Sequence, residues 1–417
     1  MKKFLLAVFL ISNVISSQEI INDTLQTTRQ DLDEVIVKGI RAKFSSPISF
    51  TNVDKQDLKS KNLGQDLPIL LNFLPSVVTT SDAGAGIGYT GIRIRGVSPQ
   101  STNITINGIP FNDPESMGTF WVNLPDFSSS IESLQVQRGV GTSTNGSGAF
   151  GASINILTDI VSDQPYAELS SSFGSYNTLK NTIKFSTGKI NDYFELSGRL
   201  SKIDSDGYVD RAYSDLKSYF IQGAYTNGST LIKAISFGGH EKTYQAWDGL
   251  SMDQVLENRR QNPLTYENEI DNYKQDHFQL HWNEKINNYW SFNLGLNYTD
   301  GRGYFEQYKE DDDINTYGGI VKSDIDSNGN ETGTTDLIRR RWLDNDFYVL
   351  NSSINYIKDK IDLTLSSSYS SYVGDHYGEV IWARSLSNTG EIRDRYYEGL
   401  GEKKDLSFFA KLLYSIN

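Results

Sequence analysis

The sequence predicts a mainly β protein, with a small α+β domain at residues 51–160 and long antiparallel strands at residues 165–417. Before residue 160, glycine-rich turns separate short apolar segments. After Pro165, apolar and polar residues alternate over long segments, as in strands with one apolar face. The 24 tyrosines also favour β structure. Because the chain has no cysteine, a disulfide framework is excluded.

The segment at residues 131–158 organises the predicted N-terminal domain. Residues 134–137 alternate as a short strand, and residues 154–157 resume a strand after a glycine-rich loop. Two glycine runs, at residues 86–91 and 146–151, fit the spacing of dinucleotide-binding folds. Each is followed by a strand pattern, whereas that motif requires a helix. Nucleotide binding is therefore not expected.

Two short helices are predicted at residues 55–64 and 66–73, and strands at residues 92–94 and 103–106. The pair Asn107-Gly108 predicts a tight turn with positive φ angles. The leucines of the second helix recur at helical spacing, which indicates core packing rather than a cofactor site; they are Leu67, Leu70, Leu71 and Leu74.

The beginning of the chain has the pattern of an export signal. Residues 1–17 combine two lysines, an apolar run and small residues before residue 18. The alternative is a membrane anchor, but the apolar run is too short to cross about 30 Å of hydrocarbon. Residues 18–50 are expected to form a periplasmic leader. The net charge of −13 argues against a nucleic-acid partner.

Three segments, in this order, resemble TonB-dependent outer-membrane receptors of the siderophore type. Residues 32–37 (LDEVIV) are similar to the segment that binds the energy-coupling protein, residues 91–108 to the central strands of the plug domain, and residues 131–158 to its closing signature. The positions that carry the resemblance are Asp33, Glu34, Val35, Ile36 and Val37 in the coupling segment, and Arg93, Arg95, Gly96, Asn107, Gly108, Glu132, Arg138, Gly139, Gly146, Gly148 and Gly151 in the plug. The alternative for the coupling segment is a purely structural role as the first strand of the plug.

The resemblance implies a plug domain at residues 51–160, followed by an incomplete antiparallel transmembrane β-barrel. Alternating apolar and polar residues within 194–200, 290–299 and 361–370 fit strands with a lipid face and a lumen face. About ten strands are expected, with short turns at 187–192 and 283–288, and long loops at 243–272, 305–341 and 375–404. Since a barrel that holds a plug needs about 22 strands, we expect the chain to be the N-terminal part of a longer receptor. A soluble β-sandwich is the structural alternative.

The resemblance implies active import of a scarce, large ligand across the outer membrane, with an iron–siderophore complex as the preferred ligand. The expected partners are a TonB-like periplasmic protein, the ligand and outer-membrane lipid. Uptake of cobalamin, haem or oligosaccharide, a soluble β-rich surface-binding protein, and a truncated product without function are the alternatives. No nucleophile–base pairing or cofactor motif is found, so neither an enzyme nor a bound cofactor is expected.

Aromatic and polar residues of the plug apex and outer loops are the candidate ligand contacts, because such side chains suit a partly apolar chelate. They are Tyr89, Phe111, Asn112, Phe120, Trp121, Tyr244, Gln245, Trp247, Arg302 and Tyr304. His277 and His281 share the polar face of a predicted strand and should point into the lumen, as ordinary lumen residues rather than iron ligands. The acidic run at residues 310–313 is expected to be a solvated loop rather than a cation site.

Overall fold

The structure is a computed structural model that describes residues 41–44, 46–140 and 149–416. The predicted signal peptide (residues 1–17), the leader up to residue 40 and the coupling segment from Asp33 to Val37 lie outside these residues. Gly146 and Gly148 of the predicted plug signature also lie outside them.

The N-terminal domain, residues 49–158, is built on a five-stranded sheet with the order β1-β6-β7-β4-β5. The pairing of β4 with β7 is parallel, and the other pairings are antiparallel. The sheet strands are β1 (Ser49–Asp54), β4 (Thr102–Ile106), β5 (Ile109–Pro110), β6 (Ile131–Arg138) and β7 (Ala152–Thr158). A separate hairpin and short helices complete the domain: β2 (Val77–Ser81), β3 (Thr90–Ile94), α2 (Lys55–Lys59), α3 (Leu67–Leu70), η1 (Pro99–Ser101), η2 (Trp121–Asn123) and η3 (Phe127–Ser130).

Apolar side chains from one face of this sheet form the core, and the predicted leucines pack into it. The exposed fractions of Ile104, Val136 and Ile154 are 1% or less. The predicted strands are confirmed, but both helices are shorter than predicted. Beyond α2 the chain turns so that the Asn62 amide can donate to the Asp126 carboxylate at 2.9 Å. This long-range contact is not visible in the local pattern.

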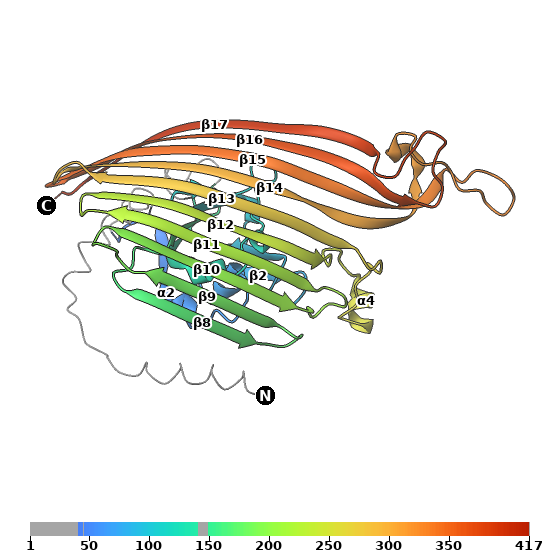
Figure 1. The fold of residues 1–417 in the computed structure, drawn as a ribbon, viewed down its shortest axis with the longest axis horizontal. Helices are drawn as coiled ribbons and strands as arrows, with labels where there is room; N and C mark the ends of the chain where they lie inside the picture. Colours follow the sequence, from blue (N-terminus) through green and yellow to red (C-terminus); the bar gives the residue numbers. More distant parts are fainter. Residues whose placement is uncertain (1–40, 45, 141–148, 417) are drawn as a thin grey trace, which may run out of the picture.

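Ten antiparallel strands form the second sheet, and each pairs with its neighbours in the sequence. Figure 1 shows this sheet arching over one side of the N-terminal domain. The strands are β8 (Pro165–Phe173), β9 (Leu179–Thr187), β10 (Phe194–Ser205), β11 (Ser214–Thr226), β12 (Thr230–Tyr244), β13 (Ile270–Lys285), β14 (Trp290–Asp313), β15 (Thr334–Lys358), β16 (Ile361–Ala383) and β17 (Arg395–Tyr414). The expected number of strands is confirmed.

The connections are short at one end of this sheet and mostly longer at the other, as predicted, but two loop boundaries were wrong. Nearly half of the predicted loop at 305–341 and most of the one at 375–404 are strand, because β14 to β17 continue far into them. Polar residues occupy both faces of these extensions, so the alternation that marks a strand disappears there. The longest connections contain α4 (Met252–Glu257) and η5 (Ile314–Tyr317).

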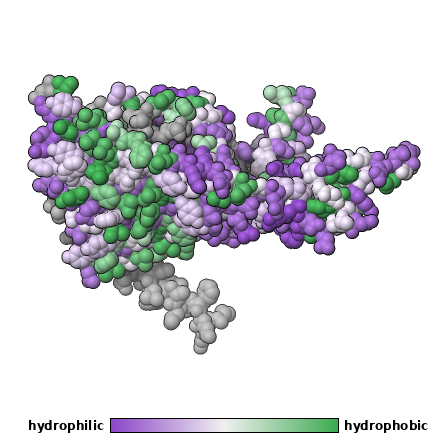
Figure 2. All heavy atoms as spheres, turned by 90° about the horizontal axis from the view of Figure 1, so that it is seen from above, coloured by the Kyte–Doolittle hydropathy of each residue, from purple (hydrophilic) through white to green (hydrophobic). Residues whose placement is uncertain are grey.

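The two faces of the ten-stranded sheet differ in polarity. The outer face exposes a continuous set of apolar side chains, with exposed fractions of 46% for Phe278, 40% for Leu296 and 44% for Leu350. The inner face is polar and is covered by the N-terminal domain. Figure 2 shows hydrophobic residues gathered over the body of the sheet, whereas the projecting loops are mostly hydrophilic. A soluble sandwich would bury these apolar faces against each other, so the sandwich alternative does not fit.

Aromatic rings on the outer face form two belts. Trp290 packs on Tyr356 near the short turns, and Tyr298 stacks on Tyr348 farther along the strands. Trp290 and Tyr298 are about 26 Å apart along β14 at ~3.3 Å per residue. Tilted strands of this length cover most of the ~25 Å apolar band of a membrane barrel. In the part of the chain that the structure describes, no helix is long and apolar enough to cross a membrane.

Candidate ligand site

A cavity of ≈ 510 Å³ lies between the N-terminal domain and the inner faces of β12 to β16, toward the long connections. We call it the outer cavity. Aromatic side chains dominate its lining: Tyr89, Phe111, Phe120, Trp247, Tyr273, Tyr304, Phe305, Trp342, Phe347 and Tyr397. Its size and its mixture of aromatic and polar groups suit a small-molecule ligand.

Tyr89 lies at the base of the outer cavity, at the end of the glycine loop that precedes β3. Its ring makes an edge contact with Trp247 at a centroid distance of 5.5 Å. Its hydroxyl donates to the carboxylate of Asp271 and lies 3.5 Å from that of Glu241. Burial, together with these two carboxylates, raises the pKa of Tyr89. The hydroxyl therefore stays protonated and ties the glycine loop to β12 and β13.

Phe111 and His277 form the deeper wall of the outer cavity. The Phe111 ring lies 5.4 Å from the His277 ring, which stacks on Phe237 at 4.5 Å. His277 also shares a 2.8 Å hydrogen bond with Thr299. His277 and His281 both point inward, as predicted. They are buried against the N-terminal domain, and His281 hydrogen-bonds Gln279 at 3.1 Å.

The charged groups of the outer cavity are mostly acidic. Asp82, Asp113, Glu241 and Asp271 line it, against the single guanidinium of Arg341. His376 also reaches the lining, and its Nε2 lies 2.7 Å from the Glu115 carboxylate. Burial raises the pKa of Asp82.

Six of the ten predicted ligand contacts border the outer cavity, namely Tyr89, Phe111, Asn112, Phe120, Trp247 and Tyr304. Tyr304 borders it from the edge of β14, since it has the same outward parity as Tyr298. Asn112 contributes to the wall, but its amide is already committed to the domain. Its Oδ1 accepts from the Ile104 N–H at 2.7 Å, and its Nδ2 donates to the carbonyls of Thr102 and Met117. Asn112 therefore shapes the wall.

The other four predicted contacts lie elsewhere, which corrects the sequence-based assignment. Trp121 is 3% exposed in the core of the N-terminal domain. Tyr244 donates its hydroxyl to the carbonyls of Leu264 and Tyr266, and the Gln245 amide donates to those of Ile270 and Glu306. Both residues thus hold the loop after β12. Nothing in the local pattern shows that this loop folds back on itself.

Arg302 is the clearest correction, since it lies on the outer face of β14. It shares the strand parity of Tyr298, and its guanidinium lies 3.4 Å from the Asp344 carboxylate. The same parity rule identifies lining residues that sequence reasoning missed. Odd-numbered residues of β13, β14 and β15 face inward with His277. The missed residues on these positions include Tyr273, Gln275, Thr299, Arg341, Asn345 and Phe347.

The acidic run at residues 310–313 is not a free loop but the end of β14. Asp312 accepts from the Tyr317 hydroxyl at 2.6 Å, and Asp313 accepts from the Asn315 N–H at 2.9 Å. Within the described ranges, no group of three or more His, Cys, Asp or Glu side chains is arranged to hold a metal ion.

The predicted plug-signature residues support the fold of the N-terminal domain. Asn107 and Gly108 form the expected turn with φ angles of 53° and 80°, and Arg95-Gly96 forms another at 55° and 75°. Glu132 pairs with Lys55 at 3.0 Å, and Arg138 donates to Thr51 at 2.7 Å. Arg93 is exposed on β3.

Glycine is required at the end of the loop between β6 and β7. The Gly139 N–H donates to the Gly151 carbonyl at 2.7 Å, and Gly139 has a φ angle of +98°. A Cβ at Gly151 would lie 2.7 Å from a methyl carbon of Val97. Only glycine allows this close approach.

Buried ion pairs join the N-terminal domain to β9 and β10. The Asp126 carboxylate lies 2.6 Å from the Lys180 ammonium and 3.4 Å from the Arg199 guanidinium. Although burial opposes it, Arg199 and Lys180 hold the pKa of Asp126 well below its usual range. A second carboxylate, Asp159, lies 2.6 Å from the Lys184 ammonium, and Lys184 and Lys55 lower its pKa against the effect of burial.

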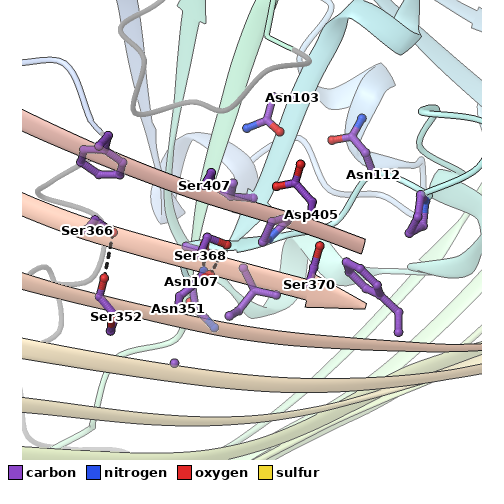
Figure 3. A pocket seen from close by; sticks show the side chains of 18 of the residues that line it. Asn103, Asn107, Asn112, Asn351, Ser352, Ser366, Ser368, Ser370, Asp405 and Ser407 are labelled. Carbon is purple, nitrogen blue, oxygen red and sulfur yellow. Dashed lines mark hydrogen bonds between the residues drawn. The ribbon is translucent and has the colours of Figure 1, made fainter. Parts of the chain in front are cut away.

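A second cavity, of ≈ 460 Å³, separates the N-terminal domain from β14 to β17. We call it the serine-lined cavity. Figure 3 shows Asn103, Asn107 and Asn112 of the domain facing the serine and asparagine side chains of these strands. The Asn351 amide crosses the interface and donates to the Gly108 carbonyl at 2.8 Å. The strand side of the cavity carries Asn351, Ser352, Ser366, Ser368, Ser370, Asp405 and Ser407.

The structure thus combines a ten-stranded sheet that has a polar inner face, a domain packed on that face, and an aromatic cavity between the two. Residues 42–153 match the TonB-dependent Receptor Plug Domain family. These residues form a plug domain of the TonB-dependent receptor type, and the ten-stranded sheet that follows has the fold of part of the barrel in such receptors.

Known relatives and solved structures agree with this assignment. The chain is 28% identical to the vitamin B12 transporter BtuB of Vibrio vulnificus, over 50% of this chain and 33% of that protein. It is 24% identical to the ferrienterobactin receptor of Escherichia coli, over 42% and 26%. The fold matches the ferric citrate transporter FecA in its unliganded form, with a TM-score of 0.63, 15% identity, and 96% and 57% coverage. The chain thus spans about a quarter to a third of the curated relatives it matches, and about half of the matched solved chains.

Proposed function

We propose that this chain is part of an outer-membrane receptor that imports a scarce, large ligand by active transport. The main support for this proposal is the position of the N-terminal domain, which packs on the polar inner face of the sheet and borders the aromatic outer cavity. A domain in this position blocks free diffusion, so import requires that it move. The outer membrane holds no ATP, so the energy must arrive through a periplasmic partner.

We propose that this periplasmic partner binds the segment from Asp33 to Val37. Its β-branched residues favour an extended chain, which can add as a strand to a partner sheet. Replacing Val35 by proline removes an N–H that such pairing uses. The Val35→Pro receptor is expected to bind ligand with unchanged affinity and to lose uptake. A variant that still imports at the normal rate would rule this segment out.

An iron–siderophore complex is the ligand that we favour. The outer cavity supplies aromatic surface and hydrogen-bonding groups for a large chelate, and relatives are named as a siderophore receptor and as ferric enterobactin receptors. The test is growth of a deletion strain on ferric chelates as the only iron source, with the intact gene restored as control. Unchanged growth and unchanged uptake of radioactive iron would remove the iron assignment.

Cobalamin is the second candidate, because two of the relatives are named as vitamin B12 transporters. Uptake of labelled cyanocobalamin by the same strain pair separates the two ligands. Export through residues 1–17 and residence in the outer membrane are parts of this proposal. Recovery of the protein from the detergent-soluble outer-membrane fraction tests them, and recovery without detergent would contradict them.

A further inference from the structure

We propose that the outer face of β10 to β14 binds the headgroup of a membrane lipid that carries two phosphate groups. The proposal rests on the residence in the outer membrane proposed above, and it adds a lipid partner to the imported ligand. Two features form the site: a row of basic side chains at the border of the apolar face nearest the long connections, and an apolar groove below that row. Neither feature contributes to the lining of the outer cavity or of the serine-lined cavity.

The row of basic side chains, which we call the basic row, crosses five neighbouring strands at one height. Lys202 lies directly opposite Lys217, and Lys274 lies directly opposite Arg302. His240 joins the two pairs, since it lies opposite Lys217 on one side and Lys274 on the other. Like charges in directly opposite positions destabilise a sheet. An anionic partner at this height would compensate the repulsion in both pairs.

The sign of the charge changes where the basic row reaches β15. Asp344 lies opposite Arg302, and Asp375 on β16 lies opposite Asp344. A basic border is therefore not a general property of the strand ends, because it is confined to β10 to β14. This confinement indicates one local partner rather than a uniform interaction with the membrane surface.

Carboxylates on the same face neutralise only part of the basic row. Lys217, and Lys242 next to it on β12, make no ion pair with the residues that the structure describes, and both are exposed. These two ammonium groups are thus free to bind phosphate oxygens. Asp300 is exposed beneath Arg302, which places the centre of the site on β11 and β12 rather than on β14. The carboxylate partners in the row are Asp204 and Asp215 for Lys202, Asp276 for Lys274 and Asp344 for Arg302.

The width of the basic row suits a headgroup with two phosphate groups. Adjacent strands lie about 4.8 Å apart, so a row over five strands extends about 19 Å. A single phosphate group is much narrower than this. Lys217 and Lys242 can bind one phosphate group, and Lys274 on the next strand can bind a second.

An apolar groove of ≈ 660 Å³ lies on the same face, below the basic row. On β13, Phe278 in the groove is followed toward the long connections by Lys274, about 13 Å away at ~3.3 Å per residue. A fatty acyl chain in the groove would therefore place its headgroup at the basic row. The side chains that line the groove include Ile221, Phe278, Leu280, Leu296, Tyr298 and Leu350.

The experiment uses the whole chain in detergent micelles and counts bound lipid molecules by native mass spectrometry. The probes are diphosphoryl lipid A, monophosphoryl lipid A with the same acyl chains, and phosphatidylcholine. Diphosphoryl lipid A is expected to reach half-occupancy at a concentration at least tenfold lower than phosphatidylcholine, with monophosphoryl lipid A between them. The preference should shrink as the ammonium acetate concentration rises, because salt screens the attraction.

A double variant, Lys217→Gln with Lys242→Gln, assigns the preference to named residues. Its affinity for diphosphoryl lipid A should fall about tenfold or more, since each basic side chain near an anionic membrane surface contributes roughly fivefold. Its affinity for phosphatidylcholine should stay constant, because the apolar groove is unchanged. Lys285→Gln is the matched control, since Lys285 is an exposed lysine at the opposite end of β13.

The possible outcomes separate this inference from the proposed function. Equal affinity for all three lipids would overturn the headgroup site and leave import standing. Equal affinity for the two forms of lipid A would overturn the assignment of two phosphate groups. Displacement of diphosphoryl lipid A by an equal concentration of inorganic pyrophosphate would show a site for free anions and overturn the lipid partner. Binding of none of the lipids would overturn the membrane location on which the inference rests.

Discussion

The N-terminal domain is held differently on its two sides. Against β9 and β10 it is fixed by buried ion pairs, in which Asp126 also accepts from Thr182 and Ser201 at 2.7 and 2.6 Å. Against β14 to β17 the contacts are mainly neutral, and the serine-lined cavity keeps the surfaces apart. Charged groups on this side meet the domain at partly exposed positions, where Glu115 lies beside His376 and Lys403 donates to the Pro114 carbonyl at 2.8 Å. The charged side therefore anchors the domain, and the neutral side can separate from the sheet at lower free-energy cost.

The largest effect is expected from Asp126→Ala. The change leaves Lys180 and Arg199 buried without their partner, and breaking a buried pair in this way costs about 3–5 kcal/mol. The free energy of unfolding of the whole chain in micelles, from urea titration, measures the loss. Glu168→Ala is the control, because Glu168 pairs with Lys59 at an exposed site and such pairs contribute about 0–1 kcal/mol. Equal losses in the free energy of unfolding from the two changes would contradict the inference that buried ion pairs anchor the domain on β9 and β10.

The next largest effect is expected at acidic pH, which should weaken the ion pairs that hold the N-terminal domain on β9 and β10. Asp126 and Asp159 have lowered pKa values in the folded protein. Their contribution to stability is therefore complete above the unfolded aspartate pKa of about 3.9 and is lost as the pH falls below it. The urea concentration at which half of the unmodified chain is unfolded should fall between about pH 5 and about pH 3, two conditions that bracket the unfolded aspartate pKa. The Asp126→Asn variant should show a smaller fall with pH. An equally steep fall in the variant would show that other groups cause the pH dependence.

Two glycines of the sheet give a matched steric test. A Cβ at Gly239 on β12 would lie 2.4 Å from the Asn123 carbonyl oxygen, whereas at Gly295 on β14 its nearest neighbour would lie at 3.3 Å. Gly239→Ala is expected to destabilise the chain by about 1–3 kcal/mol, the usual cost of overpacking. Gly295→Ala should cost clearly less. The same urea titration measures both, and a reversed order would show that the domain packs more closely on β14 than on β12.

The smallest effect is expected at Asn351. Asn351→Ala removes the hydrogen bond to the Gly108 carbonyl, and a neutral bond of this kind contributes about 0.5–1.5 kcal/mol. The adjoining cavity gives water access to the freed carbonyl, so the loss should fall at the low end. Hydrogen exchange of the amides in β4 and β5 would report local loosening. A loss as large as that of Asp126→Ala would remove the distinction between the two sides.

Most of the fold could be predicted from the sequence, but only part of the outer cavity could. Strands such as β6, β7 and β14 show alternation that depends on neighbouring residues alone. The parity of β13 likewise placed His277 and His281 on the inner face. Arg302 was assigned to the wrong side because its residue type suited a ligand, although its parity with Tyr298 indicated the outer face. Trp121 resembled an exposed loop aromatic, but residues distant in the sequence bury it.

The sequence by itself determined which segments are strands, which face of each is apolar, and where glycine must permit a turn, because these properties follow from the side-chain period and backbone sterics. Tertiary structure alone decided which residues meet across the interface. Asp126 finds Lys180 and Arg199, and Tyr89 finds Asp271, only when the N-terminal domain packs inside the sheet. The charge balance of the outer cavity arises in the same way, since its carboxyl groups come from distant segments that no local pattern relates.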